Sequence, residues 1–214
     1  MAIKIFEKRR ITDTSKKNAI ANEISILDNL CHPGIIKYYQ RIEDVNRIYM
    51  VIEYAGSLNL KNFLAHQKKN ISLNETKIMF TKILDAVFYL HDKNIVHRDI
   101  KPENIVLNSI FCPKLVDFGF ATQASNVETN NQCGTSTYMS PEMITSQSKN
   151  DLKAADMWAL GIVLYRVVVG RQPFKGRQGL LQVTLETKSL RESQSASMTI
   201  LAFKITCAGS SLQG

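Results

Sequence analysis

The sequence is poor in cysteine, and the few cysteines that it has are far apart. None of the four stands in a CxxC pair or at another metal-binding spacing, so the spacing predicts no zinc site. We expect reduced and mostly buried thiols, as in a cytosolic protein, rather than a disulfide framework. The cysteines are Cys31, Cys112, Cys133 and Cys207.

Long hydrophobic runs are also missing. The longest apolar stretch, residues 159–170, is interrupted by Arg166 and is shorter than the roughly 20 residues of a membrane-spanning helix. The residues that follow Met1 lack the apolar segment of a signal peptide. We therefore expect no membrane insertion and a cytoplasmic protein, and a nuclear location stays open.

A nucleic-acid-binding motif is absent despite the net charge of +8. The basic residues form short groups such as 8–10, 16–17 and 68–69, without the interleaved aromatic side chains that stack on bases. A solvated surface explains such groups, and an acidic partner is the alternative. We predict no nucleic-acid partner, and no feature of the sequence predicts an oligomeric state.

One stretch combines several groups that phosphoryl transfer requires. Residues 97–104 read HRDIKPEN, and an Asp-Phe-Gly triplet begins at Asp117. Asp99 offers a proton acceptor, and Lys101 offers a cation. Asn104 and Asp117 carry oxygen atoms, which are the ligands that Mg²⁺ prefers.

This pattern resembles the catalytic and metal-binding loops of protein kinases, and the Lys after the HRD Asp resembles the serine/threonine branch. The resemblance implies transfer of the γ-phosphate of ATP to Ser or Thr hydroxyls of proteins, with ATP and Mg²⁺ as cofactors. Asp99 is then the catalytic base, and Lys101 balances the charge of the phosphoryl group. Asn104 and Asp117 are then the Mg²⁺ ligands.

The N-terminal part supplies two further candidates, Lys4 and Glu23. Residues 2–6 are predicted to be a strand, and their Ala-Ile-Lys sequence resembles the kinase strand whose Lys contacts the α- and β-phosphates. Residues 16–30 are predicted to be a helix, with Glu23 on its inward face. An acid among core positions is costly unless it is paired, so we expect Glu23 to pair with Lys4. A surface Glu is the alternative.

Two further strands are predicted over residues 35–40 and 47–54, with a turn between them. The second ends in Glu53-Tyr54-Ala55, which resembles the hinge that binds adenine through backbone groups, with Ile52 at the gatekeeper position. An ordinary strand end is the alternative. The resemblance implies nucleotide contacts from Lys4, Ala2, Ile52, Glu53, Ala55, Glu103 and Val106.

The resemblance implies an α+β, bilobal protein-kinase-like fold, but an incomplete one. We expect residues 1–54 to be a remnant of the small lobe, residues 55–174 the large lobe, and residues 175–214 a divergent tail. Kinases carry two strands and a GxGxxG loop before the strand of Lys4, and this sequence contains no GxGxxG. The last helices of the large lobe are not recognisable either.

Large-lobe elements are predicted as well. Ser72 begins a capping box for a long helix that leads into the HRD loop, and residues 58–67 are predicted to be a shorter helix. The resemblance implies that Asp156 fixes the backbone of the catalytic loop and that Thr135 contacts Asp99 and Lys101.

Regulation and substrate choice are less well marked. Residues 120–131 resemble an activation loop, which a phosphate paired with Arg98 orders in many relatives. Glu103 resembles the acid that binds a substrate Arg in basophilic kinases, whereas the second such acid aligns with Asn59. A calcium/calmodulin-dependent-kinase-like group is compatible with this pattern.

Two functions of different class are therefore predicted. The first is an active protein serine/threonine kinase, because every candidate catalytic and metal-binding residue is present. The second is a catalytically impaired, truncated kinase form that acts as a binding or dominant-negative interaction protein, because the GxGxxG loop is missing.

Overall fold

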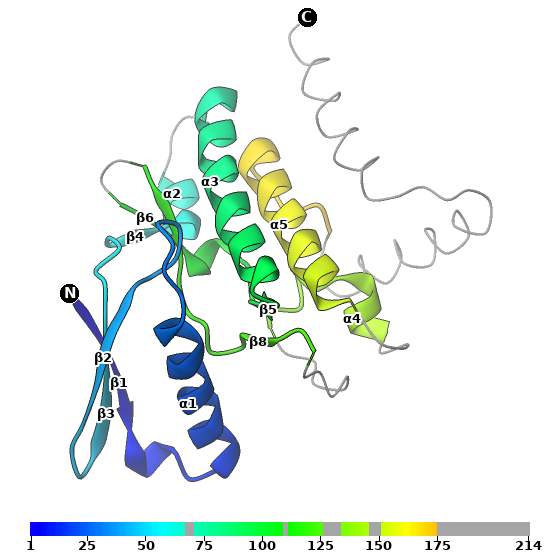
Figure 1. Ribbon diagram of the computed structural model, residues 1–214. Helices are drawn as coiled ribbons and strands as arrows, with labels where there is room; N and C mark the ends of the chain where they lie inside the picture. Colours follow the sequence, from blue (N-terminus) through cyan, green and yellow to red (C-terminus); the bar gives the residue numbers. More distant parts are fainter. Residues whose placement is uncertain (67–70, 109–110, 126–133, 146–150, 175–214) are drawn as a thin grey trace, which may run out of the picture.

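The computed structural model describes residues 1–66, 71–108, 111–125, 134–145 and 151–174. The chain has an α+β fold with two lobes, as predicted (Figure 1). A sheet and one long helix form the small lobe, and the other helices and short strands form the large lobe. Among the described residues, no helix combines the length and apolar character needed to span a membrane. The predicted tail, residues 175–214, lies outside the described residues.

The small lobe contains a three-stranded antiparallel sheet in the order β1-β3-β2. Its strands are β1 (Ala2–Glu7), β2 (Tyr38–Glu43) and β3 (Arg47–Ile52). Between β1 and β2 come the 3₁₀ turn η1 (Lys8–Arg10) and α1 (Thr14–Asp28). The Asp13 side chain caps α1 by accepting a hydrogen bond from the backbone N–H of Ser15.

Strand β2 begins later than the sequence predicts. Ile35 and Ile36 are buried, but they pair with the large lobe instead of with β3. The Ile36 N–H donates to the Leu115 carbonyl at 3.0 Å, and the Leu115 N–H donates to the Gly34 carbonyl at 2.8 Å. The apolar run that looked like the start of a strand is therefore a connection between the two lobes.

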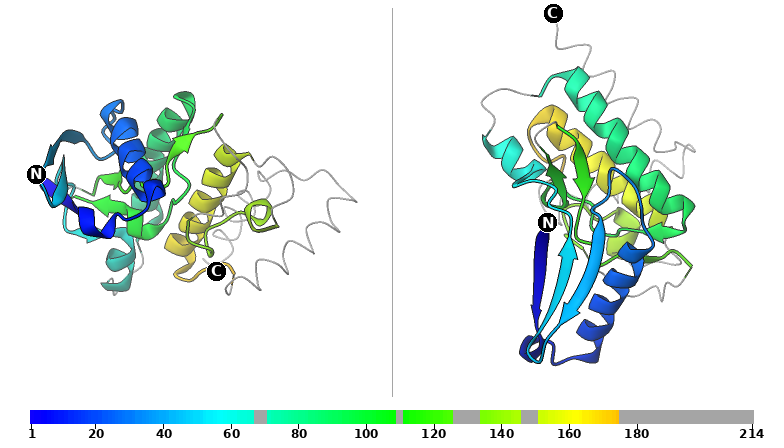
Figure 2. Two further views of the ribbon diagram at one scale, coloured as in Figure 1. Left: turned by 90° about the horizontal axis from the view of Figure 1, so that it is seen from below. Right: turned by 60° about the vertical axis from the view of Figure 1, so that its left-hand side comes forward.

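Two long helices, α3 (Leu73–Asp92) and α5 (Leu152–Val169), lie side by side in the large lobe (Figure 2). The predicted capping box is confirmed, because Ser72 accepts from the Glu75 N–H and Glu75 accepts from the Ser72 N–H. Helix α5 begins after the capping residue Asp151 and ends at Gly170, whose φ of 78° favours glycine. The short helix α4 (Pro141–Thr145) lies before α5 in the chain.

Short strands position the loops of the large lobe. One sheet has the order β4-β6-β7, and β5 pairs with β8. The strands are β4 (Leu58–Asn59), β5 (Ile95–Val96), β6 (Ile105–Leu107), β7 (Pro113–Leu115) and β8 (Thr122–Gln123). The helix predicted from residue 58 begins instead as α2 (Leu60–His66), because Leu58 and Asn59 pair with β6. The 3₁₀ turn η2 (Pro102–Asn104) connects the catalytic loop to β6.

Candidate active site

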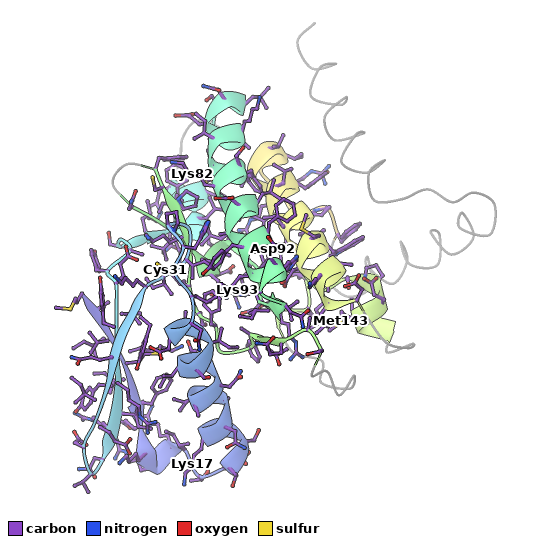
Figure 3. All side chains as sticks on the ribbon, viewed as in Figure 1. Lys17, Cys31, Lys82, Asp92, Lys93 and Met143 are labelled. Atoms are coloured by element: carbon purple, nitrogen blue, oxygen red, sulfur yellow. The ribbon has the colours of Figure 1, made fainter. Side chains whose placement is uncertain are left out.

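The catalytic loop begins where α3 ends. Figure 3 labels Lys93, the C-terminal cap of α3, at the end of that helix, and β5 follows directly. Arg98, the second residue after β5, has a φ of 66°. Such a left-handed conformation is uncommon for a residue other than glycine, and strained residues of this kind cluster at functional sites.

The structure gathers hydrogen-bond donors around Asp99, which is 5% exposed. Lys101 Nζ lies 2.6 Å from Asp99 Oδ2. The Asn104 amide donates to the same oxygen at 2.9 Å and to the Asp99 backbone carbonyl at 2.9 Å. These bonds fix the orientation of the carboxylate.

Thr135 completes this group, as the sequence predicts. Its backbone N–H and its hydroxyl reach Asp99 Oδ1 at 3.2 and 3.3 Å, and Lys101 Nζ donates to Thr135 Oγ1 at 2.9 Å. The preceding Gly134 has a φ of 98°, and a Cβ added there would lie 2.7 Å from the Arg98 carbonyl oxygen. Only glycine therefore fits this close approach between the two loops.

A second charged cluster joins the small lobe to the Asp-Phe-Gly loop. Lys4 Nζ lies 2.8 Å from Glu23 Oε1 and 2.9 Å from Asp117 Oδ1. Lys4 comes from β1 and Glu23 from the inward face of α1, which confirms the predicted pair. Asp117 has a φ of 61°, so the Asp-Phe-Gly loop also holds a residue in the left-handed region.

The electrostatics of this second cluster keep both Lys4 and Asp117 charged. Burial raises the pKa of Asp117, but attraction and hydrogen bonding to Lys4 outweigh burial, so the pKa lies below its ordinary value. Burial lowers the pKa of Lys4, but Glu23 and Asp117 outweigh burial, so the pKa lies above its ordinary value. Near neutral pH both groups are therefore ionised.

Contacts between the two loops connect the two clusters. The rings of His97 and Phe118 meet edge to face, with centroids 4.8 Å apart. The Val116 N–H donates to the Asn104 carbonyl at 3.0 Å, and His97 Nε2 lies 3.2 Å from the Val116 carbonyl oxygen. Both rings are fully buried, so the two loops are fixed to each other by packing as well as by hydrogen bonds.

Helix α5 anchors the catalytic loop through Asp156, which is 1% exposed. Its carboxylate accepts the backbone N–H of His97 at 2.8 Å and that of Arg98 at 2.9 Å. The predicted role of Asp156 in fixing this backbone is confirmed. His91 Nε2 also lies 3.1 Å from Asp156 Oδ2. No motif in the sequence indicates this contact.

The predicted nucleotide-contacting residues come from both lobes. Ala2 and Ile52 are paired on neighbouring strands, and Glu53 and Ala55 follow β3 directly. Val106 lies in β6 of the large lobe. The remaining residue of this set, Glu103, lies in η2, and its carboxylate is 3.0 Å from Lys61 Nζ.

Sequence reasoning missed two residues that bind across the site. Asn22 on α1 donates to the Ala121 carbonyl at 2.8 Å, which attaches the helix to the segment after the Asp-Phe-Gly triplet. Lys114 Nζ lies 3.0 Å from Glu53 Oε2 and donates to the Pro33 carbonyl at 2.7 Å. Neither residue stands in a recognisable motif, so only the fold reveals these contacts. Residues 126–131 of the predicted activation loop, which spans residues 120–131, lie outside the described residues.

Comparison with known proteins decides the family. The protein kinase domain family matches residues 1–207 of the chain. The chain belongs to the protein kinase family. This kinase is 36% identical over 174 residues to Aurora/IPL1-related protein kinase 2 of Caenorhabditis briggsae, covering 81% of this chain and 57% of that protein. It is 35% identical over 179 residues to Aurora kinase of Schizosaccharomyces pombe, covering 84% of this chain and 50% of that protein.

Serine/threonine-protein kinase PLK4 of Drosophila virilis is also similar to this kinase. The two are 34% identical over 177 residues, which cover 81% of this chain and 22% of that protein. These names confirm the serine/threonine kinase resemblance, and the calcium/calmodulin-dependent-kinase-like grouping stays a prediction. The chain spans about half the length of the Aurora relatives that it matches. Enzymes of the family use ATP and Mg²⁺.

Proposed function

We propose that this kinase chain transfers the γ-phosphate of ATP to Ser or Thr hydroxyls of protein substrates. One observation carries the proposal: the loops that hold the Asp99 cluster and the cluster of Lys4, Glu23 and Asp117 are connected through the contact of His97 with Phe118. A proton acceptor, cations and candidate metal ligands thus converge from both lobes. Phosphoryl transfer depends on such positioning and charge neutralisation more than on covalent chemistry.

Asn104 and Asp117 fit a Mg²⁺ site by the chemistry of their donor atoms. The Asn104 amide nitrogen is used in bonds to Asp99, which leaves the amide oxygen as its ligand atom. Asp117 is 49% exposed at its side chain and keeps a negative charge, because its pKa is lowered. Both offer the hard oxygen ligands that Mg²⁺ prefers. When bound, the metal neutralises charge on the phosphate oxygens.

The chain's own residues orient the reactants. Asp99 receives the hydrogen bond, and then the proton, of the substrate hydroxyl, while Lys101 and Thr135 hold its carboxylate in place. The Lys4 ammonium binds phosphate oxygens, and Glu23 holds that ammonium between the lobes. Ala2, Ile52, Ala55 and Val106 form the apolar surface for the adenine ring, with the backbone of Glu53 and Glu103 beside it.

Phosphate incorporation into a mixed peptide library tests this function. We expect Mg²⁺- and ATP-dependent labelling of Ser and Thr, and a rate lower by about 10²–10⁴ for Asp99→Asn, which removes the proton acceptor. Asp117→Asn should also abolish labelling, and Asp92→Asn at the exposed end of α3 is the matched control. Equal labelling by the wild type and Asp117→Asn would refute the proposal.

Thermal unfolding with and without Mg²⁺-ATP separates the two predicted functions. A ligand that binds only the folded state raises its stability by mass action. Stabilisation together with labelling supports the enzyme. Stabilisation without labelling would refute transfer by this chain and support the non-catalytic binding protein.

A further inference from the structure

A group of polar side chains extends from Asp99 along the large lobe, away from the small lobe. We call Lys61, Glu103, Tyr138 and Arg166 the flanking cluster. Lys61 Nζ on α2 lies 3.0 Å from Glu103 Oε1 in η2. Arg166 Nη1 on α5 donates to the Tyr138 hydroxyl at 2.7 Å.

The flanking cluster is continuous with the position of the substrate hydroxyl. The Tyr138 N–H donates to the Thr135 carbonyl at 2.9 Å, and Thr135 itself bonds to Asp99. Glu103 follows Lys101 after a single Pro, in the turn that leaves the catalytic loop. The charged groups assigned above to ATP, Lys4 and Asp117, form the other cluster and lie 2.9 Å from each other. The flanking cluster is therefore adjacent to the place where a polypeptide would present its hydroxyl to Asp99.

The charges of the flanking cluster are predominantly positive. Glu103 is its one acid, against Lys61 and Arg166. Burial raises the pKa of Glu103, but the hydrogen bond from Lys61 and the charges of Lys61 and Arg166 outweigh burial, so the pKa lies below its ordinary value. Glu103 is thus ionised, and its charge already has two basic neighbours. Its side chain is 31% exposed and that of Lys61 is 50% exposed, so both are accessible to a peptide.

In basophilic kinases a second acid binds the substrate, but residue 59, which aligns with that acid, adds no negative charge to the flanking cluster. Asn59 is neutral, and its Oδ1 accepts the backbone N–H of Asn62 at 2.8 Å at the start of α2. An arginine side chain arriving at Glu103 would have to displace Lys61 and approach Arg166. Like charges brought together at an interface lower affinity and exclude the wrong partner.

We propose that the flanking cluster selects acceptor peptides with acidic residues beside the Ser or Thr, and that Lys61 and Arg166 are the specificity-determining residues. This inference rests on the proposed function for the site of transfer. An Asp or Glu side chain next to the acceptor pairs with Lys61 or with the guanidinium of Arg166, where an Arg or Lys side chain is repelled. Glu103 then serves to position Lys61 and leaves little free negative charge for a basic substrate.

Peptide binding tests the proposal without any phosphate transfer. Three fluorescent peptides share one core in which Ala replaces the acceptor, and their flanking residues are Glu, Gln or Arg. Fluorescence anisotropy with the full chain, without ATP, at low and at physiological salt gives the three affinities. We expect the Glu peptide to bind about tenfold more tightly than the Arg peptide, with a smaller difference at higher salt. Equal binding, or tighter binding of the Arg peptide, would overturn the proposal.

Variants of Lys61 and Arg166 test whether these two residues cause the preference for the Glu peptide. Lys61→Glu changes an exposed side chain and is expected to fold, and Arg166→Gln keeps an amide donor near Tyr138. The double variant should lose the preference for the Glu peptide. Lys16→Glu with Lys17→Gln is the matched control, because it changes the net charge equally on the exposed face of α1. If both double variants shift the affinities alike, the effect is one of overall charge, and the flanking cluster is not the site.

Glu103→Gln tests the opposite interpretation. Glu103 Oε2 is buried and has no hydrogen-bond partner in the described part of the chain, so a basic preference, if there were one, would depend on this oxygen. If Glu103→Gln weakens the Arg peptide severalfold and leaves the Glu peptide unchanged, a basic preference is shown and the proposal is wrong. A chain that binds the Glu peptide in this pattern but transfers no phosphate would refute the proposed function and leave the proposed binding preference in place.

Discussion

At the scale of single residues, Lys4 does more than form one ion pair. Its ammonium lies within 3 Å of one carboxylate from α1 and of another from the Asp-Phe-Gly loop. Glu23 is only 4% exposed at its side chain, so its charge is tolerated because Lys4 is there. One cation thus holds a helix of the small lobe and a loop of the large lobe in a fixed relation.

We expect Lys4→Met to destabilise the protein by about 1–3 kcal/mol, because it leaves the Glu23 carboxylate buried without a counter-ion. The figure is below that of a fully buried pair, since the Lys4 side chain is 35% exposed. Urea unfolding of Lys4→Met, Glu23→Gln and the double variant measures the interaction energy between the Lys4 and Glu23 side chains. Lys8→Met, which breaks the more exposed pair with Glu43, should destabilise the protein less than Lys4→Met does. Additive effects of the two substitutions at Lys4 and Glu23 would contradict this account.

The lowered pKa of Asp117 gives a pH dependence with a definite sign. A carboxyl whose pKa is lowered on folding stabilises the protein above its ordinary value of 3.8, and the contribution is lost as the pH falls through the lowered pKa. The raised pKa of Lys4 acts in the opposite direction, and its contribution is lost only above 10.5. We therefore expect the stability difference between the wild type and Asp117→Asn to be constant from about pH 5 to 9 and to shrink below about pH 4. Unfolding midpoints of both proteins, measured from below about pH 4 to about pH 9, give this stability difference. A difference that grows in acid would contradict an ionised Asp117 in the folded protein.

At the scale of elements, α5 is the support on which the catalytic loop is built. Its Asp156 carboxylate accepts two backbone N–H groups of the loop and also contacts His91 on α3. The loop contains a strained residue, Arg98, and carries the proposed catalytic base. A strained loop keeps its conformation only where its surroundings determine it, and here a buried helix supplies that support.

We expect Asp156→Ala to cost about 2–4 kcal/mol, because the buried N–H of His97 and its neighbour are left without an acceptor. Phosphate incorporation should fall together with stability, since the Asp99 backbone is released. Asp156→Asn keeps one carbonyl acceptor and should be intermediate in both measurements. Asp151→Ala, at the exposed N-terminal cap of the same helix, should cost about 1 kcal/mol and leave transfer unchanged. Full activity of Asp156→Ala would show that α5 does not position the loop.

At the scale of the whole molecule, one main hydrophobic cluster spans both lobes, but most of its residues lie in the large lobe. Its buried members come mainly from α3, α5 and the strands around the catalytic loop. Among the described residues of the β1-β3-β2 sheet, only Met50 belongs to the buried part of this cluster. Ile3, Ile5 and Ile42 of that sheet are about half exposed. The two lobes therefore have different local stabilities.

Hydrogen exchange should reveal this difference. We expect the slowest amides in the central turns of α3 and α5 and faster exchange in β1 and β2, because few apolar contacts hold those strands. Mg²⁺-ATP should slow exchange in β1 through Lys4 more than in α3, since the ligand binds between the lobes. Mass-spectrometric exchange of the chain with and without nucleotide measures both effects. Protection of β1 equal to that of α3 in the free protein would contradict the assignment of the main core.

The sequence alone indicated the candidate site residues and the start of α3, because the HRD and Asp-Phe-Gly motifs, the Glu23 position and the capping box are local patterns with fixed spacing. Helix and strand positions followed from periodicity, with errors of a few residues at Ile35 and Leu58, where partners distant in the sequence decide the pairing. Only the tertiary structure showed that Asp156 meets His91, that Lys114 joins Glu53 to the Pro33 carbonyl, and that Glu103 pairs with Lys61. Each of these contacts depends on distance and burial between segments far apart in the chain, and no local pattern encodes them.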